Sequence, residues 1–200
     1  YKRQDLDGST GFKYVRDIRS LDDFNGVWNL RINDLGDEFM ISSSQMGPFP
    51  EGLQVGLVNI NERKVLLNFL DHNEMIPNNK NSVYDLKVIA GDQEYVKSMS
   101  QEILSSIPEE FSLGQNYPNP FNPITQMEYS LPQSSKVVIS IYNVLGQEIK
   151  TLVNKEQDYG YHSVSWDGTD RLGKSVASGV YFTQMRSDGF SQSKKMLLLK

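Results

Sequence analysis

The sequence predicts an all-β protein with two β-sandwich domains in tandem. Helical periodicity is scarce along the chain, and short runs that alternate apolar and polar residues predominate. Gly, Pro, Asn and Asp bound these runs at intervals of roughly eight to twelve residues, which is typical of sandwiches. The length of 200 residues favours two modest domains over one.

In the first half, two loops rich in Pro, Gly or Asn separate the expected strands, at residues 46–52 and 77–81. After Gly91 the pattern loosens into a polar stretch, residues 92–106, which we interpret as a final edge strand followed by a short helical or flexible connector. The expected domains are residues 1–100 and 113–200, with a linker at 101–112. The strands expected in the first half are residues 12–18, 27–32, 38–43, 53–59, 65–70 and 83–90.

The second half alternates more clearly. Met127, Tyr129 and Leu131 fall on one face of a strand, with polar residues on the other. Turns are expected at Leu145-Gly146 and at residues 187–189. About seven strands in this half predict an immunoglobulin-like sandwich. Its clearest strands are residues 125–131, 136–143, 147–153, 161–166, 179–186 and 191–199.

Composition and charge exclude or disfavour several classes of function. No apolar run approaches the length of a membrane span, and the absence of cysteine excludes disulfides, zinc–thiolate sites and thiol nucleophiles. Residues 1–105 carry 16 acidic against 11 basic side chains, and residues 106–200 carry nine of each, so no basic cluster favours a nucleic acid partner. The chain begins at Tyr1 without an initiator Met or signal segment, and we expect a fragment of a larger protein.

Three prolines make residues 116–123 a distinctive loop. Proline fixes φ and donates no hydrogen bond, so a stiff connection into the second domain is favoured over a recognition epitope. Tyr117 and Phe121 are the side chains expected to plug the end of the sandwich.

Two acidic, Gly-containing segments invite a calcium hypothesis. Residues 167–173 hold only two aspartates, whereas calcium takes six or more oxygen ligands, so a plain turn is favoured. Residues 5–10 have a better Asp-x-Asp-Gly spacing but lack a downstream bidentate Glu in register. We expect no metal and no cofactor.

The sequence offers little for catalysis. His72 and His162 are the only histidines and fall in separate predicted domains, and no phosphate-binding loop or nucleophile elbow is present. We therefore expect no enzymatic activity in this chain, although a missing upstream part could be an enzyme. Trp28, Tyr84 and Phe49 could form a sugar-stacking platform, but core positions are favoured for them.

The second half also resembles a known family. The segment Phe111-Ser-Leu-Gly-Gln-Asn-Tyr-Pro-Asn-Pro-Phe-Asn-Pro123 is similar to the opening of type A sorting domains on cargo of the type IX secretion system. The likeness continues through residues 141–147, 151–153, 160–162, 166–170 and 177–182 to Lys195-Met-Leu-Leu-Leu-Lys200. This family is similar to the immunoglobulin-like domain of the flagellar hook-capping protein.

The resemblance implies that the chain is the C-terminal part of a secreted or surface protein, which reaches the periplasm before crossing the outer membrane. Its partners would be the type IX translocon and a sortase-like peptidase, and the first domain, whose resemblance to spacer modules is weaker, would be a spacer. Alternatively, the first domain is a carbohydrate- or surface-binding accessory module of a secreted hydrolase or peptidase.

The resemblance further implies that the machinery reads the last strand together with the strand at residues 178–181. A terminal strand with free edge groups can be engaged by strand addition, and residues 194–200 carry three lysines and no acid. The residues expected to be recognised are Gly179, Val180, Tyr181, Lys194, Lys195, Met196, Leu197, Leu198, Leu199 and Lys200.

Overall fold

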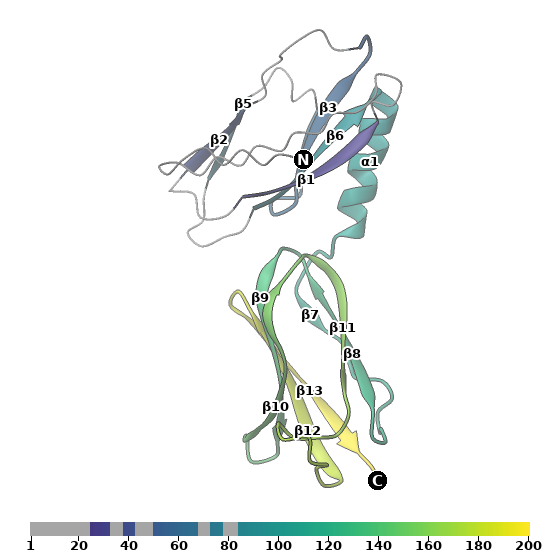
Figure 1. The fold of residues 1–200 in the computed structure, drawn as a ribbon, viewed down its shortest axis with the longest axis vertical. Coiled ribbons are helices and arrows are strands. Elements are labelled where there is room, and N and C mark those ends of the chain that lie inside the picture. Colours follow the sequence, from purple (N-terminus) through teal and green to yellow (C-terminus); the bar gives the residue numbers. More distant parts are fainter. Residues whose placement is uncertain (1–24, 33–37, 43–49, 68–72, 78–83) are drawn as a thin grey trace.

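The computed structural model describes residues 25–32, 38–42, 50–67, 73–77 and 84–200. The described chain is mostly strand, with antiparallel sheets and one helix, which confirms the all-β fold class. Two β-rich parts lie end to end along the long axis (Figure 1). The expected strand at residues 12–18, Asp5–Asp7, Phe49 and His72 lie outside the described residues.

The N-terminal part is built on a four-stranded sheet with the order β1-β6-β3-β4. A separate antiparallel pair, β2 and β5, lies on the opposite side of this sheet from the helix α1 (Figure 1). Of these strands, β5 was not expected from the sequence. The bounds are β1 Gly26–Ile32, β2 Glu38–Ser42, β3 Gln54–Asn59, β4 Lys64–Leu66, β5 Asn73–Pro77 and β6 Tyr84–Gly91.

The helix α1, Gln93–Ser106, corrects the expectation of an edge strand and a short connector after Gly91. Asp92 caps it, since its carboxylate accepts the Tyr95 N–H at 2.8 Å. Val96 and Ile103 are buried against the sheet. Residues 101–106, expected in the linker, are therefore part of this helix. The division into domains stays a prediction.

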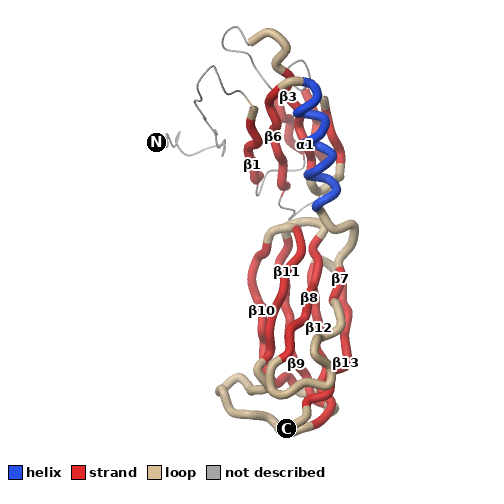
Figure 2. The backbone as a smooth tube through the Cα atoms, turned by 90° about the vertical axis from the view of Figure 1, so that its right-hand side faces the viewer, coloured by secondary structure: helices blue, strands red, loops and turns tan. Residues whose placement is uncertain are grey.

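The C-terminal part is a sandwich of two sheets, ordered β10-β9-β12-β13 and β11-β8-β7 (Figures 1 and 2). Its core includes the inward residues Met127, Tyr129 and Leu131 of β8, as the alternation predicted, together with Trp166. The two-residue strand β7 was not expected. The bounds are β7 Ser112–Leu113, β8 Thr125–Leu131, β9 Ser135–Asn143, β10 Glu148–Gln157, β11 Gly160–Trp166, β12 Gly179–Ser187 and β13 Phe190–Leu198.

Arg31 connects the two parts. Its guanidinium donates to Asp85 at 2.7 Å within the N-terminal sheet, and to Asp158 at 2.8 Å and Ser134 at 3.2 Å in the sandwich. The neighbouring Tyr159 packs against the apolar cluster beneath α1. The junction therefore combines charge pairing with apolar burial.

Arg63 fastens the segment that leaves α1. The backbone of Arg63 has a positive φ of 53°. Its guanidinium donates to the carbonyl oxygens of Leu104, Ile107 and Pro108 at 3.0 to 3.3 Å. These contacts satisfy carbonyl groups that have no partner at the end of a helix.

Candidate recognition strand and its closed edge

The hairpin β12–β13 carries the residues that the sequence singled out. Its loop consists of Asp188 and Gly189, with φ values of 40° and 78°, as a two-residue hairpin loop of this type requires. Ser187 pairs with Phe190, and the register then runs without a break to Gly179 opposite Leu198. The turn therefore fixes which residues of the two strands meet.

This register brings together two segments that are separate in sequence. Val180 lies opposite Leu197, and Tyr181 lies opposite Met196. Lys194, by contrast, pairs with Thr183, higher on the hairpin. Leu199 and Lys200 lie beyond the last ladder pair, at the end of the sandwich where the chain terminates in Figure 1.

Burial divides these residues into three groups, of which Gly179, Val180, Lys194 and Leu197 are half-buried. Met196 and Leu198 are fully buried in the sandwich core, and Tyr181 is 7% exposed. Burial raises the pKa of the Tyr181 phenol, whose hydroxyl donates to the Ala177 carbonyl at 2.8 Å. The exposed side chains, which a partner could read directly, are Lys195, Leu199 and Lys200.

The outer edge of β13 is closed over its last residues. The Phe121 N–H donates to the Leu197 carbonyl at 3.0 Å, and the Leu199 N–H donates to the Phe121 carbonyl at 2.9 Å. The Asn119 carboxamide accepts from the Leu197 N–H at 3.0 Å and donates to the Lys195 carbonyl at 3.3 Å. Gln115 donates to that same carbonyl at 2.8 Å.

The expectation of free edge groups is therefore wrong for residues 195–199. We call residues 114–123, which provide most of these contacts, the Pro-rich loop. Strand addition at this part of β13 requires the Pro-rich loop to leave first. Sequence reasoning missed Asn119 and Gln115, because no local pattern reveals that their side chains meet a strand 76 and 80 residues later in the chain.

The Pro-rich loop itself has a structural role, as favoured from its prolines. Phe121 is 2% exposed and lies 5.5 Å from the Trp166 ring, which confirms it as a plug of the sandwich end. Tyr117 is 82% exposed, so the same prediction was wrong for it. The buried Asn116 amide donates to Pro118 O at 3.0 Å and Thr125 Oγ1 at 2.9 Å, which holds the loop in shape.

The loop at residues 167–173 is built from side-chain-capped turns. Asp170 accepts the Leu172 and Lys174 N–H groups, each at 2.9 Å. The Thr169 hydroxyl donates to Asp167 at 2.6 Å and lowers the pKa of that carboxyl, assisted by Lys150 at 3.1 Å. Among the described residues, no group of three His, Cys, Asp or Glu side chains could hold a metal ion.

His162, Tyr84 and Trp28, which the sequence also singled out, are packed against other side chains. His162 stacks on Tyr129 with ring centroids 5.3 Å apart, and its Nε2 is paired with the Asp158 carbonyl oxygen. Tyr84 is buried in the core, and Trp28 packs against the same cluster, so these two rings do not form an exposed platform. No described helix has both the length and the apolarity that crossing a membrane requires.

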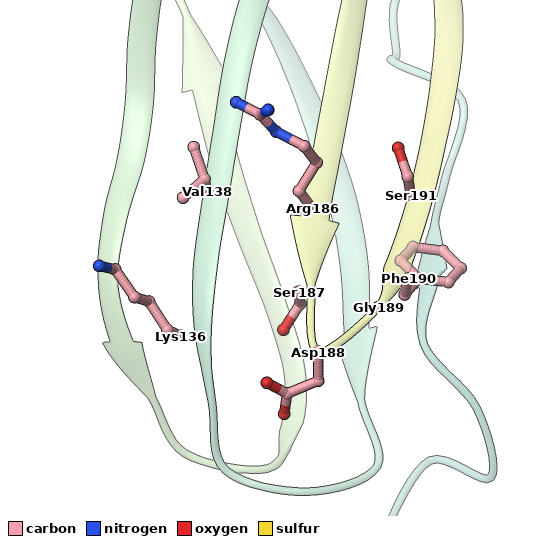
Figure 3. A pocket seen from close by; sticks show the side chains of 8 residues that line it. All are labelled: Lys136, Val138, Arg186, Ser187, Asp188, Gly189, Phe190 and Ser191. Carbon is pink, nitrogen blue, oxygen red and sulfur yellow. The ribbon is translucent and has the colours of Figure 1, made fainter. Parts of the chain in front are cut away.

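An open depression lies on the other end of the hairpin, over the outer face of β9 and the β12–β13 turn (Figure 3). Val138 lies between the cationic side chains of Lys136 and Arg186 in this view. The residues that line this depression include none of those expected to be recognised by the secretion machinery.

The two sheets and their order define an immunoglobulin-like β-sandwich. Residues 124–189, which include β8 to β12, match the family model of the FlgD Ig-like domain. No curated protein matches the sequence.

Three solved structures are similar to parts of the chain. FlgD from P. aeruginosa is 27% identical over 38% of this chain and 59% of its own, with a TM-score of 0.30. PorZ, a surface component of the type IX secretion system of Porphyromonas gingivalis, is 15% identical over 60% of this chain and 15% of its own, with a TM-score of 0.33. Dimeric latent PorU from the same organism is 14% identical over 88% of this chain and 18% of its own, with a TM-score of 0.39. The chain thus spans less than two thirds of each of these proteins.

Proposed function

We propose that the C-terminal sandwich is a sorting signal that directs a larger secreted protein through the outer membrane by the type IX secretion system. The observation that carries this proposal is the β12–β13 register. It aligns Val180 with Leu197 and Tyr181 with Met196, so two segments of the sorting-domain resemblance become one continuous ladder.

The position of this ladder supports the proposal. Its end lies at the end of the sandwich that points away from the N-terminal part (Figure 1). Lys195, Leu199 and Lys200 are exposed there, and they present two cations beside an apolar side chain to an acidic and apolar partner. The Lys200 ammonium also donates to Ser175 Oγ and to the Val176 carbonyl, which hold it at this end of the sandwich. The N-terminal part would then act as a spacer between the cargo and the signal.

Burial dictates how the proposal is tested. Deleting residues 194–200 removes Met196 and Leu198 from the core, so loss of export would also follow from simple unfolding. The exposed pair Lys195→Glu and Lys200→Glu reverses the local charge and leaves both core residues in place. The matched control reverses two exposed lysines elsewhere on the sandwich, Lys136→Glu and Lys155→Glu.

In a host with a type IX system, we expect the first double variant to accumulate in the periplasm while the control reaches the medium or the cell surface. Circular dichroism of both purified variants checks that each is folded. Export of the Lys195/Lys200 variant at the wild-type level would refute the role assigned to these side chains.

A further inference from the structure

The C-terminal sandwich has four sheet edges, and three of them are protected against pairing with another strand. The end of β13 is closed by the Pro-rich loop, as described above. The edge of β10 is interrupted by two register shifts, and its Ile149 carbonyl accepts the Arg171 N–H at 3.1 Å. The third edge, β7, is two residues long, and its Leu113 N–H donates to the Gln192 side chain at 2.7 Å.

The fourth edge, β11, has none of these protections. It pairs with β8 in unbroken register over seven residues, from Gly160 opposite Leu131 to Trp166 opposite Thr125. Its sequence, GYHSVSW, contains no Lys, Arg, Asp, Glu or Pro. Natural proteins blunt exposed edges with such residues, with bulges or with covering loops, so an open flat edge is a surface for strand pairing.

The hydrogen bonds of β8 show which groups of β11 are open. On the β7 side, Gln126 exchanges both backbone bonds with Tyr117, and the Glu128 carbonyl accepts the Gly114 N–H. Antiparallel bonding alternates along a strand, so the alternate residues of β8, which are Thr125, Met127, Tyr129 and Leu131, face β11 and bond Trp166, Val164, His162 and Gly160. Tyr161, Ser163 and Ser165 of β11 therefore direct their N–H and C=O groups away from β8. Within the described parts of the chain, these six groups have no hydrogen-bond partner.

We propose that β11 is a pairing surface for a second copy of this chain, added antiparallel about a two-fold axis at Ser163. In this register Ser163 lies opposite its own counterpart, and Tyr161 lies opposite Ser165 of the second copy. Each of the three pairs exchanges two bonds, so all the open groups of both strands are satisfied. The edge is complementary to itself, which is the property an isologous interface requires.

The charges along the paired residues permit this pairing. The side chains beside the seam are Tyr161, Ser163 and Ser165, all exposed and uncharged. The nearest acid on the adjacent strand is Glu128, opposite Ser163. The two copies of Glu128 would be separated by three strand spacings, about 14 Å, which exceeds the Debye length of about 8 Å at physiological salt. The antiparallel arrangement also places the two N-terminal parts at opposite ends.

The first test is the oligomeric state of the 200-residue chain by sedimentation equilibrium. Concentrations from about 10 µM to about 1 mM cover the range in which a small interface associates. Ser163→Lys places two like charges opposite each other on the axis, and we expect it to weaken the dimer at least about tenfold. Ser191→Lys, on an exposed serine of β13, is the matched control and should leave association unchanged. A wild-type chain that stays monomeric throughout, or a dimer lost in the Ser191 variant alone, would overturn the proposal.

The second test uses the absence of cysteine from the chain. Residues in a hydrogen-bonded antiparallel pair have Cα atoms about 5.5 Å apart, within the range that a disulfide spans. On mild oxidation Ser163→Cys should therefore give a covalent dimer on a non-reducing gel, and Ser191→Cys should stay at the background level. Equal cross-linking of both variants would indicate random collision and would also overturn the proposal.

Discussion

Asn119 and Phe121 hold the edge of the last strand by different means. Asn119 supplies a carboxamide that imitates a neighbouring strand toward Leu197 and Lys195, at the surface. Phe121 adds backbone bonds to Leu197 and Leu199 and anchors the loop through a ring buried against Trp166. Loss of the carboxamide should therefore expose the edge locally, whereas loss of the ring should destabilise the sandwich.

We predict that Asn119→Ala selectively accelerates amide hydrogen exchange at Leu197, because Asn119 Oδ1 is the acceptor of that N–H. The cost in free energy of unfolding should be about 1 kcal/mol, as for a typical hydrogen bond. Phe121→Ala should cost about 3–5 kcal/mol, as for a buried aromatic ring. Tyr117→Ala is the control with an exposed ring in the same loop. Unchanged exchange at Leu197 in Asn119→Ala would contradict this role.

Thr169 controls the acidity of its neighbour Asp167. The hydroxyl hydrogen bond stabilises the carboxylate, so the pKa of Asp167 in the folded state lies below its unfolded value. This stabilisation is fully present above the unfolded pKa and is lost as the pH falls through the folded one. Thr169→Val should raise the pKa of Asp167, as measured by NMR titration of its side-chain carboxyl. A pKa that does not rise would show that Lys150 and the Thr169 backbone N–H, rather than the hydroxyl, set the acidity.

At the scale of elements, the sequence predicted strands better than the helix. The alternation in β8 and the Asp188-Gly189 turn are local signals, and the structure follows them closely. The helix α1 was not predicted because Ser100 occupies a buried position between Val96 and Ile103, where it interrupts the apolar stripe. Ser100 is accommodated there because its hydroxyl donates to the Val96 carbonyl at 2.7 Å.

The candidate site was predictable in part for the same reason. The hairpin turn is encoded locally, so the pairing of Gly179 with Leu198 follows once the turn is recognised. The closure of β13 depends on Asn119 meeting Leu197 across 78 residues, and no local propensity encodes that contact. The β12–β13 hairpin could thus be predicted from the sequence, whereas the closure of its outer edge could not.

For α1, we predict that the N-cap decides much of its stability. Asp92→Ala removes the acceptor of the Tyr95 N–H and should cost about 1 kcal/mol, while Asp92→Asn should retain most of the capping. Thermal unfolding followed by far-ultraviolet circular dichroism compares the three proteins. Equal losses in both variants would show that the carboxylate charge, rather than the cap, is what stabilises the helix.

At the scale of the whole molecule, Arg31 is the polar link between the two parts. Its hydrogen bond to Asp85 is the main reason that its pKa is raised, and Asp85 is largely buried. Asp158, on the sandwich, is 70% exposed. The guanidinium is thus held firmly on the N-terminal sheet and more loosely on the sandwich.

A double-mutant cycle should separate these two contacts. For Arg31→Ala with Asp158→Ala we expect a coupling of about 0.2–1 kcal/mol, as for exposed ion pairs, and a larger coupling for Arg31→Ala with Asp85→Ala. Chemical unfolding of the single and double variants gives both values. If the Asp158 coupling is the larger, the link is anchored on the sandwich instead.

If the C-terminal sandwich is a sorting signal, as we propose, this chain should export a passenger protein that is fused to it. A periplasmic fluorescent protein fused in front of residues 1–200 should appear outside the outer membrane in a host with a type IX system. The same passenger without the fusion should stay in the periplasm. Retention of the folded fusion in the periplasm, at the level of the passenger alone, would contradict the account.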